Sequence, residues 1–403
     1  MINLKELSLR IHSVCVMRNL LRDSLINALI EFLDLPEEAH INHKVGLYTD
    51  FVHCLYSSGT ENLSEYIQKI INESENVYVR IKGKGETPSA FLEKSLFEDL
   101  KTFNMIASLV PEDLTVDLDG CDFLPKWDAK KIDIEKDYLK RVDRIEKFGY
   151  GIYAKYKMFY IDERGAITPV QNPDPIRLDA LVDYKREQKI IMDNTRALLC
   201  GKPAANILLT GDAGTGKSST IKAVVNELYE EGLRIIEVRK EQLHGIPKIL
   251  DELTENPLKF ILFIDDLSFT KDDDNFSALK AILEGSVSAK SGNVTIYATS
   301  NRRHLVKESF SNREGDDVHF NDTMQELLSL SERFGIQLTF QRPDKETYLD
   351  IVRSLAEKNS IEFDEEKLYA AAERFALRRG TRSARAAKQF IDGIIADNAE
   401  NIR

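Results

Sequence analysis

Up to about residue 170, apolar and polar residues alternate with the spacing of amphipathic helices. Apolar residues recur three and four positions apart in several segments, so each segment would bury one stripe of a helix. These segments are 18–35, 45–59, 62–74 and 89–110. An aromatic and apolar run at 150–170 then predicts two strands around a turn at Glu163, Arg164 and Gly165. We therefore expect a mostly helical N-terminal domain over residues 1–170 that ends in a β-ribbon.

From about residue 176 the pattern changes to short apolar runs separated by helical spacing. Continuous apolar strands bounded by helices predict a parallel sheet that is covered on both faces. The runs are 206–210, 233–239, 260–266, 294–300 and 336–340. Pro173 and Pro175 in the preceding linker fit neither a helix interior nor a central strand. We therefore expect an α/β domain over 171–342, and the helical pattern after Pro343 predicts a small helical domain over 343–403.

The composition is typical of a globular protein in a reducing compartment. Of 403 residues, 42% are hydrophobic and 30% charged, and the net charge of −12 disfavours non-specific nucleic-acid binding over the whole surface. The four cysteines lack Cys-x-x-Cys spacing and the seven histidines show no metal-ligand pairing, so neither a zinc site nor a disulfide framework is indicated. No apolar run approaches the roughly 20 residues that span a bilayer, and the first residues lack the apolar core of a secretion signal. We therefore expect a cytoplasmic protein without membrane contact.

The stretch LLTGDAGTGKSST, residues 208–220, has the spacing of a phosphate-binding loop between a strand and a helix. Its glycines let successive backbone N–H groups point at an anion, and the following helix adds the positive end of its dipole. Lys217 would reach the β- and γ-phosphates, and the Ser218 hydroxyl would ligate Mg²⁺. The alternative is a plain strand–turn–helix connection. On the first interpretation the ATP contacts are Gly211, Asp212, Ala213, Gly214, Thr215, Gly216, Lys217, Ser218 and Ser219.

Polar residues end two of the later apolar strands. Asp265 and Asp266 close the run at 260–266, where a carboxylate would stand beside the phosphate loop. We expect Asp265 to hold Mg²⁺ through water and Asp266 to orient the attacking water, the alternative being that Asp266 only caps a turn. Asp266 is one methylene shorter than the glutamate more usual in such sites. Asn301 follows the run at 294–300, and its amide would bond the γ-phosphate and the water, although asparagine is also an ordinary turn residue.

Arginines at two places are candidates for contact with the γ-phosphate. Arg333 precedes the last strand and would act on a neighbouring subunit as an arginine finger, the alternative being an ion pair with Glu332 or another acid. Near the C-terminus Thr381 would cap a helix, which would place Arg382 in the first turn and Arg385 on the same face. One of these two would sense the γ-phosphate, and the alternative is a solvated basic face.

The order of these motifs resembles that of AAA+ ATPases. GDAGTGKSS, FILFIDD, YATSN, SERFG and GTRSAR follow one another as Walker A, Walker B, sensor 1, arginine finger and sensor 2 do. More specifically, DDLSF, ATSNRRHL and LSLSERFG resemble the uncharacterised bacterial AAA+ family catalogued as domain of unknown function 815. The paired aspartates and ERFG are also similar to bacterial replication initiator and helicase-loader ATPases.

The resemblance implies a P-loop AAA+ module with a five-stranded sheet of order 5-1-4-3-2 and a helical lid from about residue 343. It also implies that ATP is held between sheet domain and lid, and that the chain assembles into a ring or short helical homo-oligomer, because the finger acts in trans. Adenine contacts would come from Leu181, Val182 and Tyr184.

The function expected from these motifs is that of a Mg²⁺-dependent ATPase, a hydrolase that remodels or loads an unknown protein or nucleic-acid partner. The alternative, motivated by the short Asp266, is an ATP-gated binding switch with negligible hydrolysis. A small-molecule kinase is disfavoured because the tail resembles a sensor-bearing lid. No particular client follows, since fold does not fix function.

Overall fold

The computed structural model describes residues 2–36, 38–116, 118, 120–268, 274–284, 292–301 and 332–400. Backbone contacts divide the chain into two compact units. The first contains residues 1–155 together with 255–258, and the second contains 156–254 together with 259–403. Each unit is described by itself.

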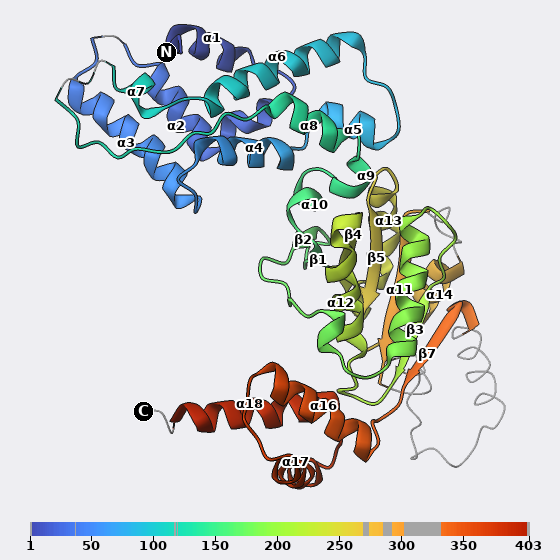
Figure 1. The fold of residues 1–403 in the computed structure, drawn as a ribbon. Helices are drawn as coiled ribbons and strands as arrows, with labels where there is room; N and C mark the ends of the chain where they lie inside the picture. Colours follow the sequence, from blue (N-terminus) through green and yellow to red (C-terminus); the bar gives the residue numbers. More distant parts are fainter. Residues whose placement is uncertain are drawn as a thin grey trace. The chain divides into compact units, whose positions relative to one another are not determined.

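The first unit consists of helices (Figure 1). They are α1 (Leu4–Ser13), α2 (Ser24–Leu33), α3 (Ile41–Ser57), α4 (Leu63–Glu73), α5 (Val77–Gly83), α6 (Ala90–Ala107), α7 (Pro111–Leu114), α8 (Ile134–Val142), α9 (Ile145–Phe148) and α10 (Ile152–Lys155). Apolar residues of α1 to α9 share one core, in which Trp127 packs against the rings of Tyr48 and Phe51. The indole N–H of Trp127 donates to the Leu109 carbonyl oxygen at 2.9 Å, so its one polar atom is satisfied inside the core.

One helix expected in this unit is interrupted. The predicted segment 18–35 consists of a 3₁₀ turn at Arg18–Arg22 followed by α2. The break lies at Asp23, whose Oδ1 accepts the N–H groups of Leu25 and Ile26 at 3.0 and 3.3 Å. An aspartate that caps the next helix satisfies donors that would otherwise have no partner, and it cannot do so from a helix interior.

A buried carboxylate on α6 holds the chain that follows α1. Asp99 is 4% exposed and accepts the backbone N–H groups of Cys15, Val16 and Met17 at 2.7–3.2 Å. Burial raises the pKa of the Asp99 carboxyl, and the three N–H bonds oppose that rise. This buried contact joins α6 to the residues after α1 through donors that would otherwise be unsatisfied.

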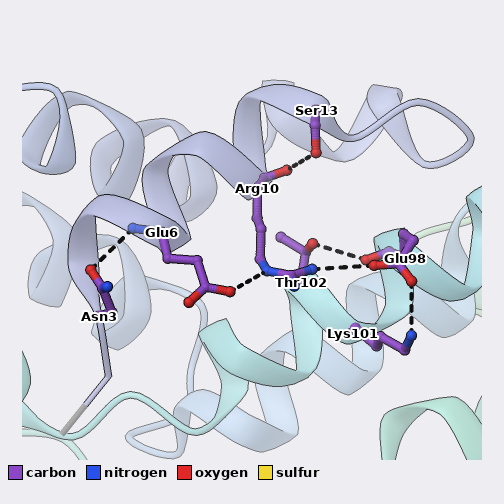
Figure 2. Close-up of polar contacts among 7 residues, drawn as sticks. All are labelled: Asn3, Glu6, Arg10, Ser13, Glu98, Lys101 and Thr102. Atoms are coloured by element: carbon purple, nitrogen blue, oxygen red, sulfur yellow. Dashed lines mark hydrogen bonds and ion pairs between the residues drawn. The ribbon is translucent and has the colours of Figure 1, made fainter.

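At the surface, α1 and α6 are also joined by ion pairs (Figure 2). The Arg10 guanidinium reaches Glu6 on its own helix at 2.8 Å and Glu98 on α6 at 3.3 Å. Lys101 donates to the same Glu98 carboxylate at 2.8 Å. Because these groups are solvated, we expect them to contribute little to stability compared with the apolar core and Asp99.

The second unit is built on a seven-stranded sheet (Figure 1). Its strands are β1 (Met158–Ile161), β2 (Ile167–Pro169), β3 (Ile207–Gly211), β4 (Leu233–Val238), β5 (Lys259–Ile264), β6 (Val294–Ser300) and β7 (Ile336–Phe340). The order is β2-β1-β4-β5-β6-β3-β7, and all neighbours pair in parallel except β1 and β2. The expected α/β class with a parallel sheet is therefore confirmed.

The expected β-ribbon belongs to this sheet and not to the N-terminal unit. β1 and β2 form the predicted hairpin, and β1 also pairs in parallel with β4, with Phe159 opposite Ile236. The contact boundary accordingly lies at residue 155 and not at 170. Sequence periodicity does not reveal which partner an edge strand will pair with, because pairing is decided by tertiary structure. The strands of residues 207–340, numbered in chain order, read 5-1-4-3-2 along the sheet, with the hairpin added beyond β4.

Helices cover the sheet, and further helices follow it. They are α11 (Lys185–Leu199), α12 (Lys217–Leu228), α13 (Ile246–Thr254) and α14 (Asp274–Glu284), then α16 (Lys345–Lys358), α17 (Glu365–Arg379) and α18 (Ala384–Glu400). Apolar residues of α11 and α12 share a core with alternate residues of the strands, and α16, α17 and α18 form a separate core of their own. Among the described residues, no helix is both long and apolar enough to cross a bilayer.

Candidate active site

The glycine-rich loop lies between the buried strand β3 and helix α12. Three of its glycines have positive φ: Gly211 at 139°, Gly214 at 81° and Gly216 at 92°. A Cβ on Gly211 would lie 2.0 Å from the Phe340 backbone oxygen of the neighbouring strand β7. Gly216 adopts the left-handed conformation at the N-terminus of α12. The loop therefore needs glycine for close approach at one position and for backbone conformation at the others.

Lys217, the first residue of α12, extends into the loop. Its side chain is buried, and its Nζ donates to the Gly211 and Asp212 carbonyl oxygens at 2.9 and 2.8 Å and to Asn301 Oδ1 at 3.0 Å. Burial lowers the pKa of Lys217, while Asp265 and other nearby carboxylates oppose that change. The fold thus brings together Lys217 and Asn301, which are far apart in the sequence.

Asp265 follows β5 and accepts hydrogen bonds from two hydroxyl groups. Ser218 Oγ and Thr299 Oγ1 both donate to Asp265 Oδ1, at 2.6 and 2.5 Å. The residue predicted to ligate the metal and the residue predicted to hold it through water are therefore in direct contact. Thr299 was not among the residues singled out from the sequence. The available signal was its position two residues before Asn301, because side chains two apart in extended chain point to the same side.

Asp266 has an unusual backbone conformation, with φ of 54°. Its N–H donates to Thr299 Oγ1 at 3.0 Å, and its Oδ1 accepts the Asn301 side-chain N–H at 2.7 Å. The amide of Asn301 thus lies between Lys217 and Asp266, accepting from the first and donating to the second. Asp265 and Asp266 are both exposed, so these carboxylates remain accessible beside a buried cation.

The oxygen ligands at this position fit Mg²⁺. The hydroxyl of Ser218 and the carboxylate of Asp265 are hard oxygen donors within 2.6 Å of each other. In the described part of the chain, His, Cys, Asp and Glu side chains form no group of three or more that could hold a metal ion by themselves. Magnesium in nucleotide sites is held by one or two protein oxygens together with phosphate and water, so this small ligand set suits it. An open hollow of about 290 Å³ adjoins the two aspartates and is also lined by Arg239 and Lys240.

The two C-terminal arginines have different surroundings. Helix α18 begins at Ala384, and its cap is Ser383, whose Oγ accepts the Ala386 N–H at 3.2 Å. The expected cap at Thr381 is therefore wrong, and Arg382 lies before the helix. There Arg382 makes two hydrogen bonds with Glu373 of α17, at 3.0 and 2.9 Å, and this guanidinium lowers the pKa of the Glu373 carboxyl.

Arg385, by contrast, lies at the glycine-rich loop. Its backbone N–H donates to the Gly214 carbonyl oxygen at 3.3 Å, and a Cβ on Gly214 would lie 3.2 Å from the Arg385 Cβ. The positive charge of Arg385 contributes to lowering the pKa of Lys217. Among the described residues, no side chain or carbonyl forms a hydrogen bond or ion pair with its guanidinium. Arg385, and not Arg382, is therefore the one of the two arginines that contacts the glycine-rich loop.

Arg333, the candidate finger, forms an ion pair within its own chain. Its Nε and Nη2 lie 2.9 and 2.5 Å from Glu284 Oε1 at the end of α14. The alternative expected from the sequence was an ion pair of Arg333 with Glu332 or another acid. The acid that pairs with it in the structure is Glu284. This pair joins Arg333 to α14. Residues 302–331 lie outside the described part of the chain, and they include the end of the ATSNRRHL motif and the beginning of the LSLSERFG motif.

The candidate adenine contacts lie where the sheet and the C-terminal helices meet. Val182 packs against the core of α16–α18, whereas Tyr184 packs against the core of the sheet. The Tyr184 ring lies 4.5 Å from the Phe340 ring centroid, and its hydroxyl donates to the Gln341 carbonyl oxygen. The Leu181 carbonyl oxygen accepts hydrogen bonds from Lys185 and Gln188. Val182 and Tyr184 therefore contact different cores of the second unit.

Comparison with known proteins identifies a family over most of the second unit. The family model described as "Protein of unknown function (DUF815)" matches residues 154–398. No curated protein matches the chain. Among solved structures, the structure of C. elegans PCH-2 matches with a TM-score of 0.36 and 18% sequence identity, over 53% of this chain and 63% of that chain. This chain therefore spans less than two thirds of the PCH-2 chain.

Proposed function

The chain belongs to the DUF815 family of proteins of unknown function, as its motifs predicted, and from that premise we propose that it is an AAA+ protein that binds ATP with Mg²⁺ and hydrolyses it. The proposal rests on the chemistry of its own site. One observation carries it: residues leaving β3, β5 and β6 meet as a connected set of a buried lysine, two exposed carboxylates and an amide. The strand order from β7 to β4 and the helical α16–α18 segment support the AAA+ part of the proposal.

The glycine-rich loop would bind the phosphate chain of ATP. Backbone N–H groups at 213–218 are the donors that a curled loop and a helix N-terminus offer to an anion. Lys217 would exchange its bonds with the Gly211 and Asp212 carbonyl oxygens for bonds with phosphate oxygens. Its burial raises the value of such a bond, because a desolvated ammonium gains more from an anionic partner than a solvated one.

Hydrolysis would use the two aspartates and the amide. Ser218 and Asp265 would hold Mg²⁺, which when bound neutralises charge on the phosphate oxygens. Asp266 would orient the attacking water. Asn301, which is bonded to Lys217 and Asp266, would hold the water and the γ-phosphate in position relative to each other. Arg385 would contact the γ-phosphate from α18.

The assembly and client remain part of the same proposal. Arg333 would act on the site of a neighbouring copy, so we expect a homo-oligomer in the form of a ring or a short helical assembly. Its client would be a protein or nucleic acid that the first unit selects. We expect ATP turnover per chain to rise with protein concentration as the assembly forms.

The test is calorimetric titration with ATP and Mg²⁺, together with phosphate release, for Lys217→Ala and a matched control. Lys222→Ala removes a second lysine of α12, one that pairs with Glu237 at 3.5 Å. We expect Lys217→Ala to weaken ATP binding by roughly 10- to 100-fold, the value of a hydrogen bond to a charged group, and Lys222→Ala to change it little. No ATP affinity in the wild type, or equal affinity in Lys217→Ala, would contradict the proposal.

A second candidate function is an ATP-gated binding switch that hydrolyses negligibly. It is favoured by the length of Asp266 and by the contact of its Oδ1 with Asn301, which both limit its reach toward a water. Stoichiometric ATP binding without phosphate release, also in the presence of cell lysate, would favour the switch over the ATPase.

A further inference from the structure

Thr299 on β6 is bonded to each of the three residues that follow β5. Its hydroxyl donates to Asp265 Oδ1 at 2.5 Å and accepts the Asp266 N–H at 3.0 Å. Its carbonyl oxygen accepts the Leu267 N–H at 2.7 Å. The Thr299 side chain is 2% exposed, so this hydroxyl has no access to bulk water and its two bonds are made within the protein.

The first bond fixes the rotation of the Asp265 carboxylate. Ser218 and Thr299 both donate to Oδ1, and among the described residues nothing donates to Oδ2. Hydroxyl bonds to an ionised carboxylate are strong. Oδ1 of Asp265 is therefore hydrogen-bonded within the protein, and Oδ2 is available to an external ligand.

The second bond supports a strained backbone at Asp266. A non-glycine residue with φ of 54° lies in the left-handed region, which is strained for a residue with a side chain. The Thr299 hydroxyl accepts the N–H of that residue, and in this conformation Asp266 Oδ1 meets Asn301 at 2.7 Å. One hydroxyl in β6 thus contacts the carboxylate of Asp265 and the backbone of Asp266.

We propose that Thr299 is a positioning residue that orients Asp265 toward the metal and Asp266 toward the water. The proposal rests on the ATPase function proposed above and deepens it. A hydroxyl is needed because it must donate to one residue and accept from the next, and only serine offers the same pair of bonds from the same β-carbon.

The test compares Thr299→Val, Thr299→Ser and a matched control, Thr295→Val. Thr295 lies on the same strand and face, is likewise 2% exposed, and donates to the Ala205 carbonyl oxygen at 2.9 Å, away from the aspartates. Each protein is titrated calorimetrically with ATP in the presence of Mg²⁺ and in EDTA, and kcat and KM for phosphate release are measured separately.

For Thr299→Val we expect the gain in ATP affinity from Mg²⁺ to shrink by about 10-fold or more, the effect typical of losing a residue that orients a metal ligand. The affinity for ATP in EDTA should stay within about twofold of wild type, since the loop N–H groups and Lys217 are unchanged. The kcat should fall by roughly 10- to 100-fold while KM in saturating Mg²⁺ changes less. Thr299→Ser should restore both quantities, and Thr295→Val should leave them unchanged.

The positioning role is overturned if Thr299→Val keeps the wild-type gain in ATP affinity from Mg²⁺. It is also overturned if Thr299→Ser loses that gain as Thr299→Val does, or if Thr295→Val loses it. If the wild type binds ATP but releases no phosphate, the hydrolytic part of the proposed function fails and the Mg²⁺ gain still decides the role of Thr299. If the wild type binds no ATP at all, both proposals fall together, and that outcome is recognised in the first titration.

Discussion

Arg382 and Arg385 are only three residues apart, yet their side chains have different surroundings. Arg382 is held by both oxygens of Glu373, and this pair joins the segment before α18 to α17. Arg385 lies in the first turn of α18, where its cation opposes the positive end of the helix dipole, and its backbone contacts Gly214. A cation in that position is better stabilised by an anion on the loop than by its own helix.

Arg385→Ala should therefore slow ATP turnover or weaken ATP binding by roughly 10- to 100-fold, the value of a charged hydrogen bond to phosphate. Arg382→Ala should leave ATP affinity close to wild type and lower the unfolding temperature, because the partly buried Glu373 carboxylate loses two hydrogen bonds and keeps only the longer ion pair with Lys345 at 4.0 Å. Calorimetry and thermal unfolding of both variants measure the two effects. The opposite outcome, with nucleotide affinity lost in Arg382→Ala alone, would assign the sensing role to Arg382.

At the scale of elements, the glycine-rich loop depends on the packing of β3 against β7. These strands pair along their whole length, with Gly211 opposite Phe340. Their backbones approach so closely that a side chain on Gly211 would meet a backbone atom, which cannot move without disturbing the strand. The conformation of the loop is therefore tied to the sheet and not only to its own glycines.

Gly211→Ala should lower the free energy of unfolding of the second unit by at least about 2 kcal/mol, since φ of 139° is strained for alanine and the contact with Phe340 adds to the strain. Gly245→Ala is the matched control, because a Cβ there meets nothing within 4 Å and φ is not positive. Chemical denaturation of the two variants gives the comparison. Equal stability of Gly211→Ala and wild type would show that β7 can move away from the loop.

At the scale of the whole molecule, the candidate finger Arg333 has its described ion pair with α14 and not with the glycine-rich loop. Arg333 shortly precedes β7 in the chain and is paired with Glu284, the last residue of α14. For it to act as a finger, a second copy must place its loop near this pair. The ion pair with Glu284 would then orient the guanidinium at the surface of the donor chain.

Arg333→Ala should consequently lose most of its ATP turnover, by up to the roughly 10³–10⁵-fold attributed to such arginines. Mixing it with Lys217→Ala chains should restore turnover, because these chains can donate an intact Arg333 to the intact loops of the others. The control is a mixture with the double variant Lys217→Ala/Arg333→Ala, which has no finger to donate. No recovery in mixed oligomers verified by size and composition would remove the trans role of Arg333.

The sequence by itself determined the features that depend on local chemistry. Continuous apolar runs between helices determined a parallel sheet, because strands buried on both faces carry no polar alternation. The spacing of Gly211, Gly216 and Lys217 determined a glycine-rich loop at a helix N-terminus, and the ordered motifs determined membership of the DUF815 family. Asp265 and Asn301 could be singled out because ligands bind at the carboxyl ends of strands in such sheets, so polar residues that follow buried strands are candidate site residues.

Only the tertiary structure decided the features that depend on pairing between distant residues. Periodicity could not show that β1 pairs with β4, that Thr299 bonds both aspartates, or that Arg382 is bonded to Glu373 while Arg385 lies at the loop. An edge strand carries no signal for its partner, and a threonine in a β-strand looks like any other strand residue. Helix boundaries shift by one or two residues with the choice of cap, and here the cap is Ser383 and not Thr381, which leaves Arg382 before the helix and Arg385 inside it. Which side chains meet is set by strand register and helix packing, and these form only when the whole unit folds.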